Sequence, residues 1–438
     1  MNRSLWAVLI GTFTLRFSTG LTGLTLTYYL ANLGDHQRFL DDLFHLGQGR
    51  PVGDLGFGVI AALFYVAELT LSPVFGVISD RLGHHRVMQY GPIFGIVAVI
   101  ATWATTSLPV IGATRLLEGS ATAASVPSIL GYIAVVTAMD EGLRGKASAR
   151  FEAATLAGLL GGFVTAGLLW QAIGPETFLV NAVIYALSLA IYRFRVDPAL
   201  DPTAQPQDPS RPRFDLGRYR RVIGGTHALL LAPTWIAINA VLGLYTTQTV
   251  FQLTQKADLR FPDQLLMGGF ESTEISLGIA IGGILFFAGI VYWGNRFKNL
   301  RRTTIILYGI GGGLLVVAGA VALNHSGGLG VLPRLVFALP LVFGVFVLAG
   351  ATPAAIGLLA DVTEAFPEDR GAVMGLYSVF LGLGQITGSV IGGLSANALG
   401  LDGIFGASVI LLVLAVVPLM RLREYEHFLG PGRAEALG

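Results

Sequence analysis

The sequence predicts an all-α integral membrane protein with twelve transmembrane helices, arranged as two pseudo-symmetric six-helix bundles. Only 13% of its 438 residues are charged and 53% are hydrophobic, whereas soluble domains carry about 25% charged residues. The charges collect in short clusters between long apolar runs, and each run is long enough to cross a hydrocarbon core of ~30 Å. Because the runs lack the alternating polarity of barrel strands, we interpret them as helices.

Six spans are expected on each side of a central break. Their approximate ranges are 5–32, 55–78, 87–107, 109–138, 151–172, 176–194, 229–253, 274–294, 303–324, 332–360, 371–398 and 402–420. The first run is interrupted by Arg16 and is too long for the apolar part of a signal peptide, so we expect it to remain as the first span.

The distribution of Lys and Arg predicts the orientation. With the N-terminus inside, the inner segments hold 21 of these residues and the outer loops hold 4. The positive-inside rule therefore predicts cytoplasmic termini in an inner or plasma membrane of bacterial type. We expect an N-terminal bundle at 1–194, a Pro-rich and then basic cytoplasmic linker at 195–225, a C-terminal bundle at 226–423 and a cytoplasmic tail at 424–438.

Composition also argues against several classes of function. A net charge of +1 does not suit a nucleic-acid partner, and the absence of cysteine excludes disulfides and thiolate metal sites. No catalytic triad spacing, metal cluster or phosphate loop stands out in the sequence. We therefore expect neither an enzyme nor a bound metal or cofactor.

The two halves repeat. Placing Arg144 on Arg370 also places Gly158 on Gly384 and Gly162 on Gly388 without a gap. Spans five and eleven are therefore copies, and parallel six-span repeats are typical of secondary transporters. Glycines at a spacing of four let two helices approach closely.

Each half carries an outer insertion between its first and second spans, at 33–54 and 254–273. The first has the pattern of an amphipathic helix lying on the membrane surface. It serves either as a structural lid or as an element that admits amphiphiles sideways from the lipid.

The loop after span two contains the run GVISDRLGHHR. It resembles the G-x-x-x-D-R-x-G-R-(R/K) signature of the major facilitator superfamily, with His84 and His85 as departures. The matching positions are Gly76, Asp80, Arg81, Gly83 and Arg86. We expect a cytoplasmic gate in which Asp80 contacts a helix-end amide and an arginine in only one of two conformations. In the second half Asn295 stands where the acid would be, so that gate should be weaker.

Span four contains Arg115, Glu118 and Gly119 in an order that resembles the R-x-x-(Q/E)-G motif of proton-coupled drug antiporters of the same superfamily. The segment 361–393 resembles the family's region around spans ten and eleven. Span five lacks the Gly-Pro pair usual in such antiporters. The resemblance implies alternating access, proton-coupled export and a monomer.

Buried charge points to the same half. Glu68 and Glu118 are the acids well inside expected spans, where a charged side chain is costly unless it is paired or wet. Arg115 and Glu118 share a helix face, and Glu68 and Arg16 lie at similar depths, ~18 and ~16 Å from the cytoplasmic end. The four can converge on one central cavity, either as static ion pairs or as a proton-exchanging cluster with Glu68 as the titrating group.

The C-terminal half offers neutral polar and aromatic candidates for substrate contacts, which could equally be packing. They are Asn239, Gln248, Gln385, Trp235 and Tyr245. The sequence thus predicts a proton-coupled exporter of amphiphilic or drug-like compounds. The open alternatives are a lipid or lysolipid flippase, an uncoupled facilitator for a polar metabolite and a non-transporting receptor. Expected partners are the small-molecule or lipid substrate, protons and membrane lipid.

Overall fold

The computed structural model describes residues 2–33, 52–138, 140–201, 228–256, 260–296, 299–365 and 370–425. Across these ranges the regular structure is entirely helical. The expected surface helix at 33–54 falls almost wholly outside the described residues, as do most of the expected linker and tail.

The chain forms two compact units, Met1–Arg213 with Phe270–Ala280, and Phe214–Gly269 with Ile281–Gly438. The first unit therefore includes the beginning of α12 (Ser272–Gly294). Unit 1 holds α1 (Arg3–Ala31), α3 (Asp54–Leu82), α4 (His84–Val87), α5 (Tyr90–Trp103), α6 (Leu108–Val136), α7 (Glu141–Ile173), η1 (Gly174–Glu176), α8 (Thr177–Arg195) and η2 (Pro198–Leu200).

The second half of the chain contains the remaining helices. They are α10 (Ala228–Gly243), η4 (Leu244–Thr249), α11 (Val250–Thr254), α12 (Ser272–Gly294), α13 (Arg302–Asn324), α14 (Val331–Leu348), α15 (Ala351–Ala365) and α16 (Arg370–Tyr425). The element α16 contains both span eleven and span twelve. The two helices meet at a kink at Gly400, where φ is 64°. A positive φ costs glycine little because it lacks a Cβ.

Eight helical stretches in the described part are long and apolar enough to cross a membrane by length and composition. Two of these, Lys146–Arg195 and Val379–Glu424, contain 50 and 46 residues, and each is long enough for two crossings. Together with the shorter helices they form the twelve spans of the two six-helix bundles. The fold class predicted from the apolar runs is confirmed.

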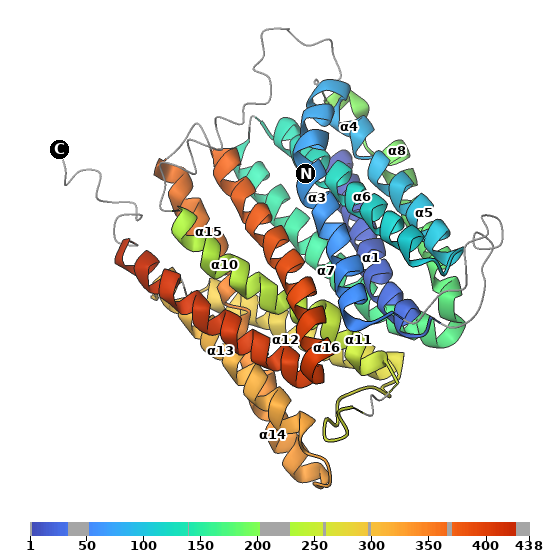
Figure 1. The fold of residues 1–438 in the computed structure, drawn as a ribbon. Helices are drawn as coiled ribbons and strands as arrows, with labels where there is room; N and C mark the ends of the chain where they lie inside the picture. Colours follow the sequence, from blue (N-terminus) through green and yellow to red (C-terminus); the bar gives the residue numbers. More distant parts are fainter. Residues whose placement is uncertain are drawn as a thin grey trace. The chain divides into compact units, whose positions relative to one another are not determined.

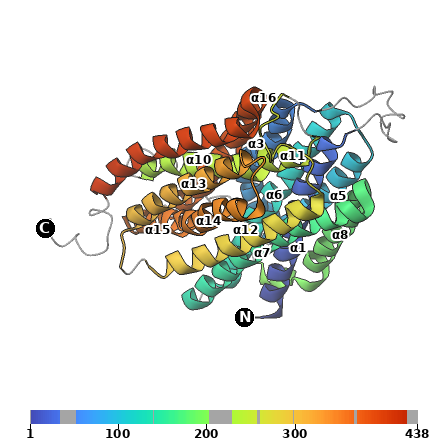
Figure 2. The same cartoon turned by 90° about the horizontal axis from the view of Figure 1, so that it is seen from below.

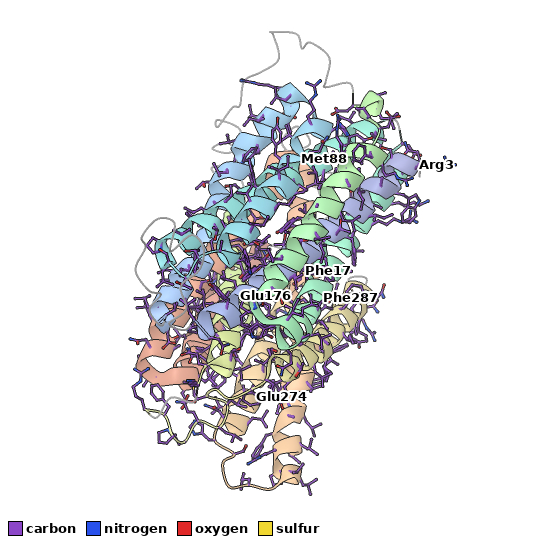
Figure 3. The ribbon with its side chains drawn as sticks, turned by 90° about the vertical axis from the view of Figure 1, so that its right-hand side faces the viewer. Arg3, Phe17, Met88, Glu176, Glu274 and Phe287 are labelled. Atoms are coloured by element: carbon purple, nitrogen blue, oxygen red, sulfur yellow. The ribbon has the colours of Figure 1, made fainter. Side chains whose placement is uncertain are left out.

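Within unit 1, α1 packs against α7, and α3 packs against α6 (Figure 1). Within unit 2, α10 packs against α16 and α13 against α14 (Figure 2). Arg3 and Met88 lie toward one end of unit 1 and Glu176 toward the opposite end, with Phe17 of α1 between them (Figure 3).

The repeated glycines make the same contacts in both units. A Cβ added at Gly162 of α7 would collide with the backbone carbonyl of Phe17 in α1, and one added at Gly388 of α16 would collide with that of Ala240 in α10. Gly388 is the repeat of Gly162 in the gapless alignment of the two halves, so the α1–α7 pair and the α10–α16 pair are built alike. The repeat seen in the sequence is a repeat of helix packing.

Candidate functional site

Two of the predicted residues form a buried ion pair on α6. The Arg115 side chain contacts Glu118 through Nη1 and Oε2, and Glu118 is only 2% exposed. The Arg115 guanidinium also lies over the Phe64 ring of α3, 4.8 Å from its centroid. This position depends on the close approach of α3 to α6. A Cβ added at Gly119 of α6 would collide with the Phe64 carbonyl of α3, so only glycine allows the two helices to pack this closely.

The other two predicted residues meet on the neighbouring helices. Glu68 of α3 interacts electrostatically with Arg16 of α1. Tyr65, one turn before Glu68, is within electrostatic range of Glu68, Arg16 and Arg115. Tyr65 is therefore close to members of both acid–base pairs, and the four predicted residues belong to one cluster inside unit 1.

Glu118 is also surrounded by hydroxyl groups. Thr22 of α1 and Tyr185 of α8 lie beside its carboxylate. Asn181 Nδ2 donates to Thr22 Oγ1 at 2.6 Å and to the Ser18 carbonyl at 3.0 Å, which holds Thr22 in place. The site thus draws side chains from α1, α3, α6 and α8.

Several polar atoms of this cluster have no hydrogen-bond partner in the described part of the chain. They include Nε of Arg16 and Nε of Arg115. A buried polar group without a partner costs roughly 1–3 kcal/mol. The two guanidinium groups of the cluster therefore have N–H donors left for water or a ligand.

One acid near the site was not predicted from the sequence. Glu152 of α7 also interacts electrostatically with Arg16. The available signal was the repeated glycine at position 158, which brings α7 against α1 at Arg16. Without the helix pairing, the sequence could not show that Glu152 faces this arginine.

The predicted gate motif spans the end of α3 and the short helix α4. Gly83 has φ of 94° and separates the two helices, which explains the need for glycine at this motif position. Asp80 is exposed, and its carboxylate lies 3.8 Å from Nε2 of His84. Gly76 faces Pro127 of α6, while Arg81 and Arg86 are exposed.

The two histidines that depart from the family signature are buried. His84 forms a hydrogen bond with Ser79 Oγ at 3.2 Å, and its ring packs where Gly131 of α6 leaves space. His85 Nε2 donates to the Tyr192 carbonyl at 3.0 Å, and its backbone N–H donates to Asp201 at 2.9 Å. Burial lowers the pKa of His85, although the hydrogen bond to Tyr192 opposes this effect.

The C-terminal candidates divide into two groups. Trp235 is 1% exposed and belongs to the hydrophobic core of unit 2, and Asn239 Nδ2 donates to the Trp235 carbonyl at 2.9 Å. Gln248 is fully buried on the π-helical turn η4, and neither of its amide atoms has a partner among the described residues. The Gln385 Oε1 atom and the Tyr245 hydroxyl are likewise buried without a partner there.

The described residues contain no group of three or more side chains suited to hold a metal ion.

The family model described as Major Facilitator Superfamily matches residues 8–332 and 268–435. Multidrug resistance protein 2 of Bacillus subtilis (strain 168) is 25% identical over 350 residues, which cover 77% of this chain and 79% of that protein. Multidrug resistance protein 1 of the same organism is 22% identical over 346 residues, with the same coverage of both chains.

Solved structures share the fold. A crystal structure of the nucleoside transporter NupG covers 97% of this chain and 99% of its own, with a TM-score of 0.69 and 13% identity. A mutant of the same transporter gives a TM-score of 0.71 at 14% identity, covering 96% of this chain and 99% of that one. At these identities the likeness concerns the fold alone.

Proposed function

Because the chain belongs to the Major Facilitator Superfamily, a family of membrane transporters, we propose that it works by alternating access as a proton-coupled exporter of amphiphilic or drug-like small molecules. The observation that carries this proposal is the cluster of Arg16, Glu68, Arg115 and Glu118 inside one bundle, with several polar atoms left unpartnered. Ionisable residues within membrane spans are expensive and mark ion pathways or substrate sites.

Each residue of the cluster has a proposed role. Glu68 exchanges the proton, because its counter-charge Arg16 comes from another helix and can move away when the bundle changes conformation. Glu118 is held by Arg115 on its own helix and keeps the site polar toward substrate. Proton binding and substrate binding then compete for one set of charges, which is the physical requirement for antiport.

The loop motif supplies the proposed gate. Asp80 and the exposed arginines Arg81 and Arg86 lie at the end of unit 1 where the N-terminus also lies, and charge pairs there form in one conformation and break in the other. The excess of Lys and Arg in the corresponding loops supports a cytoplasmic location of this end and of both termini. We expect the protein to work as a monomer in a bacterial-type inner membrane.

The substrate class rests on two indications of different kinds. The curated relatives are named multidrug resistance proteins, which favours amphiphilic or drug-like compounds. The unpartnered amides of Gln248 and Gln385, together with the nucleoside transporter among the fold neighbours, favour a polar metabolite as the second candidate. The flippase alternative draws on the same fold, on Arg16 of the first span and on the 33–54 insertion, most of which lies outside the described residues.

Transport by the purified chain in liposomes tests the proposal. A pH gradient is applied, and flux of ethidium, an amphiphilic dye, is compared with flux of uridine, a nucleoside. Gradient-driven ethidium flux that is lost in Glu68→Gln, with exchange at equal concentrations retained, is the expected result. Uridine flux that does not change with the pH gradient would instead support the uncoupled facilitator. If Glu68→Gln and Glu118→Gln both retain gradient-driven transport, coupling through this cluster is excluded.

A further inference from the structure

Glu152 is an acid that the roles above leave unused. It lies on α7, eleven residues after the helix begins at Glu141, and its side chain is exposed. Arg16 acts on it electrostatically, as it does on Glu68. Two carboxylates from two different helices therefore lie within electrostatic range of one guanidinium.

The packing of α1 on α7 explains this arrangement. A Cβ added at Gly158 would lie 2.9 Å from the Arg16 Cβ, and Gly162 meets the stretch that follows Arg16, so the two helices run parallel. Helical side chains lean toward the N-terminus of their helix. Arg16 consequently leans from the level of Gly158 toward the preceding turns of α7, where Glu152 lies ~9 Å earlier along the axis.

Arg16 is not committed to either acid. Its Nε has no hydrogen-bond partner in the described part of the chain. The other titratable groups that face it are Tyr65 beside Glu68 on α3 and Tyr192 on α8, and the hydroxyls of tyrosines add no charge. Among the other cations, Arg115 is held by Glu118, and Arg150, two residues before Glu152 on α7, lies over the Trp6 ring, 5.1 Å from its centroid.

Counting these charges decides the chemistry. The cation Arg16 is shared by two carboxylates, Glu68 and Glu152, so these three groups carry one negative charge in excess when all are ionised. Two carboxylates that share one cation disfavour each other's ionisation, and one added proton removes the excess charge. Since Arg115 and Glu118 are already paired, the proton belongs to the two acids that share Arg16.

We propose that Glu68 and Glu152 form a carboxylate pair around Arg16 that binds a single proton. This inference rests on the proposed proton coupling and extends it by naming the second acid and a capacity of one. The proton enters from water on one side as a carboxyl O–H bond forms, and it leaves to water on the other side as that bond breaks. Either acid can hold it, because Arg16 neutralises whichever acid stays ionised.

The internal repeat supports the grouping. The position equivalent to Arg16 in the second half is Asn239, and the alignment that places Gly158 on Gly384 also places Glu152 on Ser378. The cation and this acid are thus replaced together by neutral residues in the half that lacks the cluster.

Difference infrared spectroscopy tests the pair without a substrate, since protonated carboxyl groups absorb at a C=O stretch that carboxylates lack. The full chain is titrated in lipid nanodiscs as wild type, Glu68→Gln, Glu152→Gln and the double variant, with Glu176→Gln as the matched control. Each single variant should lose the C=O intensity of about one carboxyl group among the 27 Asp and Glu of the chain, because the remaining acid stays ionised beside Arg16. The double variant should lose no more than the larger single loss.

A band in Glu152→Gln equal to that of the wild type overturns the inference, as does strictly additive loss in the double variant. If Glu152→Gln does not fold, Glu152→Asp keeps the carboxylate and should shift the band without removing it, and an unshifted band also overturns the inference. Liposome flux separates the two proposals. Coupling lost in Glu68→Gln but intact in Glu152→Gln rejects the shared proton only, whereas coupling intact in the double variant rejects the proposed function itself.

Discussion

Arg16 and Asn239 occupy equivalent positions in the two halves of the chain. A Cβ added at Gly158 would lie 2.9 Å from the Cβ of Arg16, and a Cβ added at Gly384, the repeat of Gly158, would lie 2.5 Å from the Cβ of Asn239. The same helix contact therefore presents a cation in one bundle and a neutral amide in the other. The two bundles therefore share this helix packing. They differ at this position in the side chain that the packing presents, which is charged in the first bundle and neutral in the second.

Loss of the Arg115 partner should destabilise the protein more than loss of the Arg16 partner. In Glu118→Gln the cation Arg115, which is 8% exposed, loses its direct ion pair, and breaking a buried pair costs about 3–5 kcal/mol. Glu68→Gln leaves Arg16 with Glu152, so its thermal unfolding should stay close to that of the wild type. Unfolding curves of both variants in detergent measure the difference, and equal losses would contradict the separate roles.

Replacing a glycine by alanine should destabilise the protein where the added Cβ would meet a neighbouring helix, and should stabilise it where the Cβ would meet nothing. Alanine in a helix normally gains ~1 kcal/mol over glycine, and this gain is expected for Gly311→Ala of α13, where a Cβ would meet nothing within 4 Å. Gly162→Ala and Gly388→Ala place a Cβ against backbone carbonyls, which should cost about 1–3 kcal/mol. A rise in Tm for all three variants would show that these helix contacts are looser than described.

Folding stability should fall on acidification through His85. Its pKa is lowered in the folded protein from the ordinary 6.5, so the unfolded chain binds the proton first as pH falls. Stability is therefore full above about pH 6.5 and decreases below it. In His85→Gln, whose amide can still donate to the Tyr192 carbonyl, the slope of Tm against pH below 6.5 should be shallower than in the wild type. A steeper slope would reverse the sign argued here.

The exposed acid of the loop motif should affect transport and leave stability alone. Asp80→Asn removes one surface charge, and such a change usually alters stability by no more than about 0.5 kcal/mol in either direction. If Asp80 closes a gate, the variant should lose transport and shift spin-label distances between the bundles toward the state in which this end is open. Asn295→Asp, at the corresponding position of the second half, should shift them the other way. Unchanged distances in both variants would remove Asp80 from the gate.

How much the sequence could predict depended on how local each interaction is. The spans followed from uninterrupted apolar runs, and the contact of Arg115 with Glu118 followed from a spacing of three on one helix. Glu152 could not be recognised, because its relation to Arg16 exists only once α1 packs on α7. Nor could the sequence show that Trp235 is a core residue, since an aromatic side chain in a span fits a cavity wall or a core equally well.

Gln248 should be a position where stability and substrate binding oppose each other. Its amide is fully buried on the π-helical turn η4 and has no partner in the described structure, and π-helical turns are frequent at functional sites. Methionine has a similar length and no amide, so Gln248→Met should relieve an unsatisfied pair of polar atoms and raise stability by about 1–3 kcal/mol.

The same change should weaken the binding of a polar substrate, because the amide that the substrate would satisfy is gone. Thermal shifts of the wild type and Gln248→Met, each with and without uridine, measure both effects in one experiment. A higher baseline Tm with a smaller uridine shift is the expected outcome if unit 2 supplies hydrogen bonds to substrate. Ser408→Ala, whose hydroxyl already bonds the Ile404 carbonyl at 2.8 Å, is the control and should leave the uridine shift unchanged. A lower Tm in Gln248→Met would mean that the amide is satisfied in the folded protein, and Gln248 would then be a packing residue.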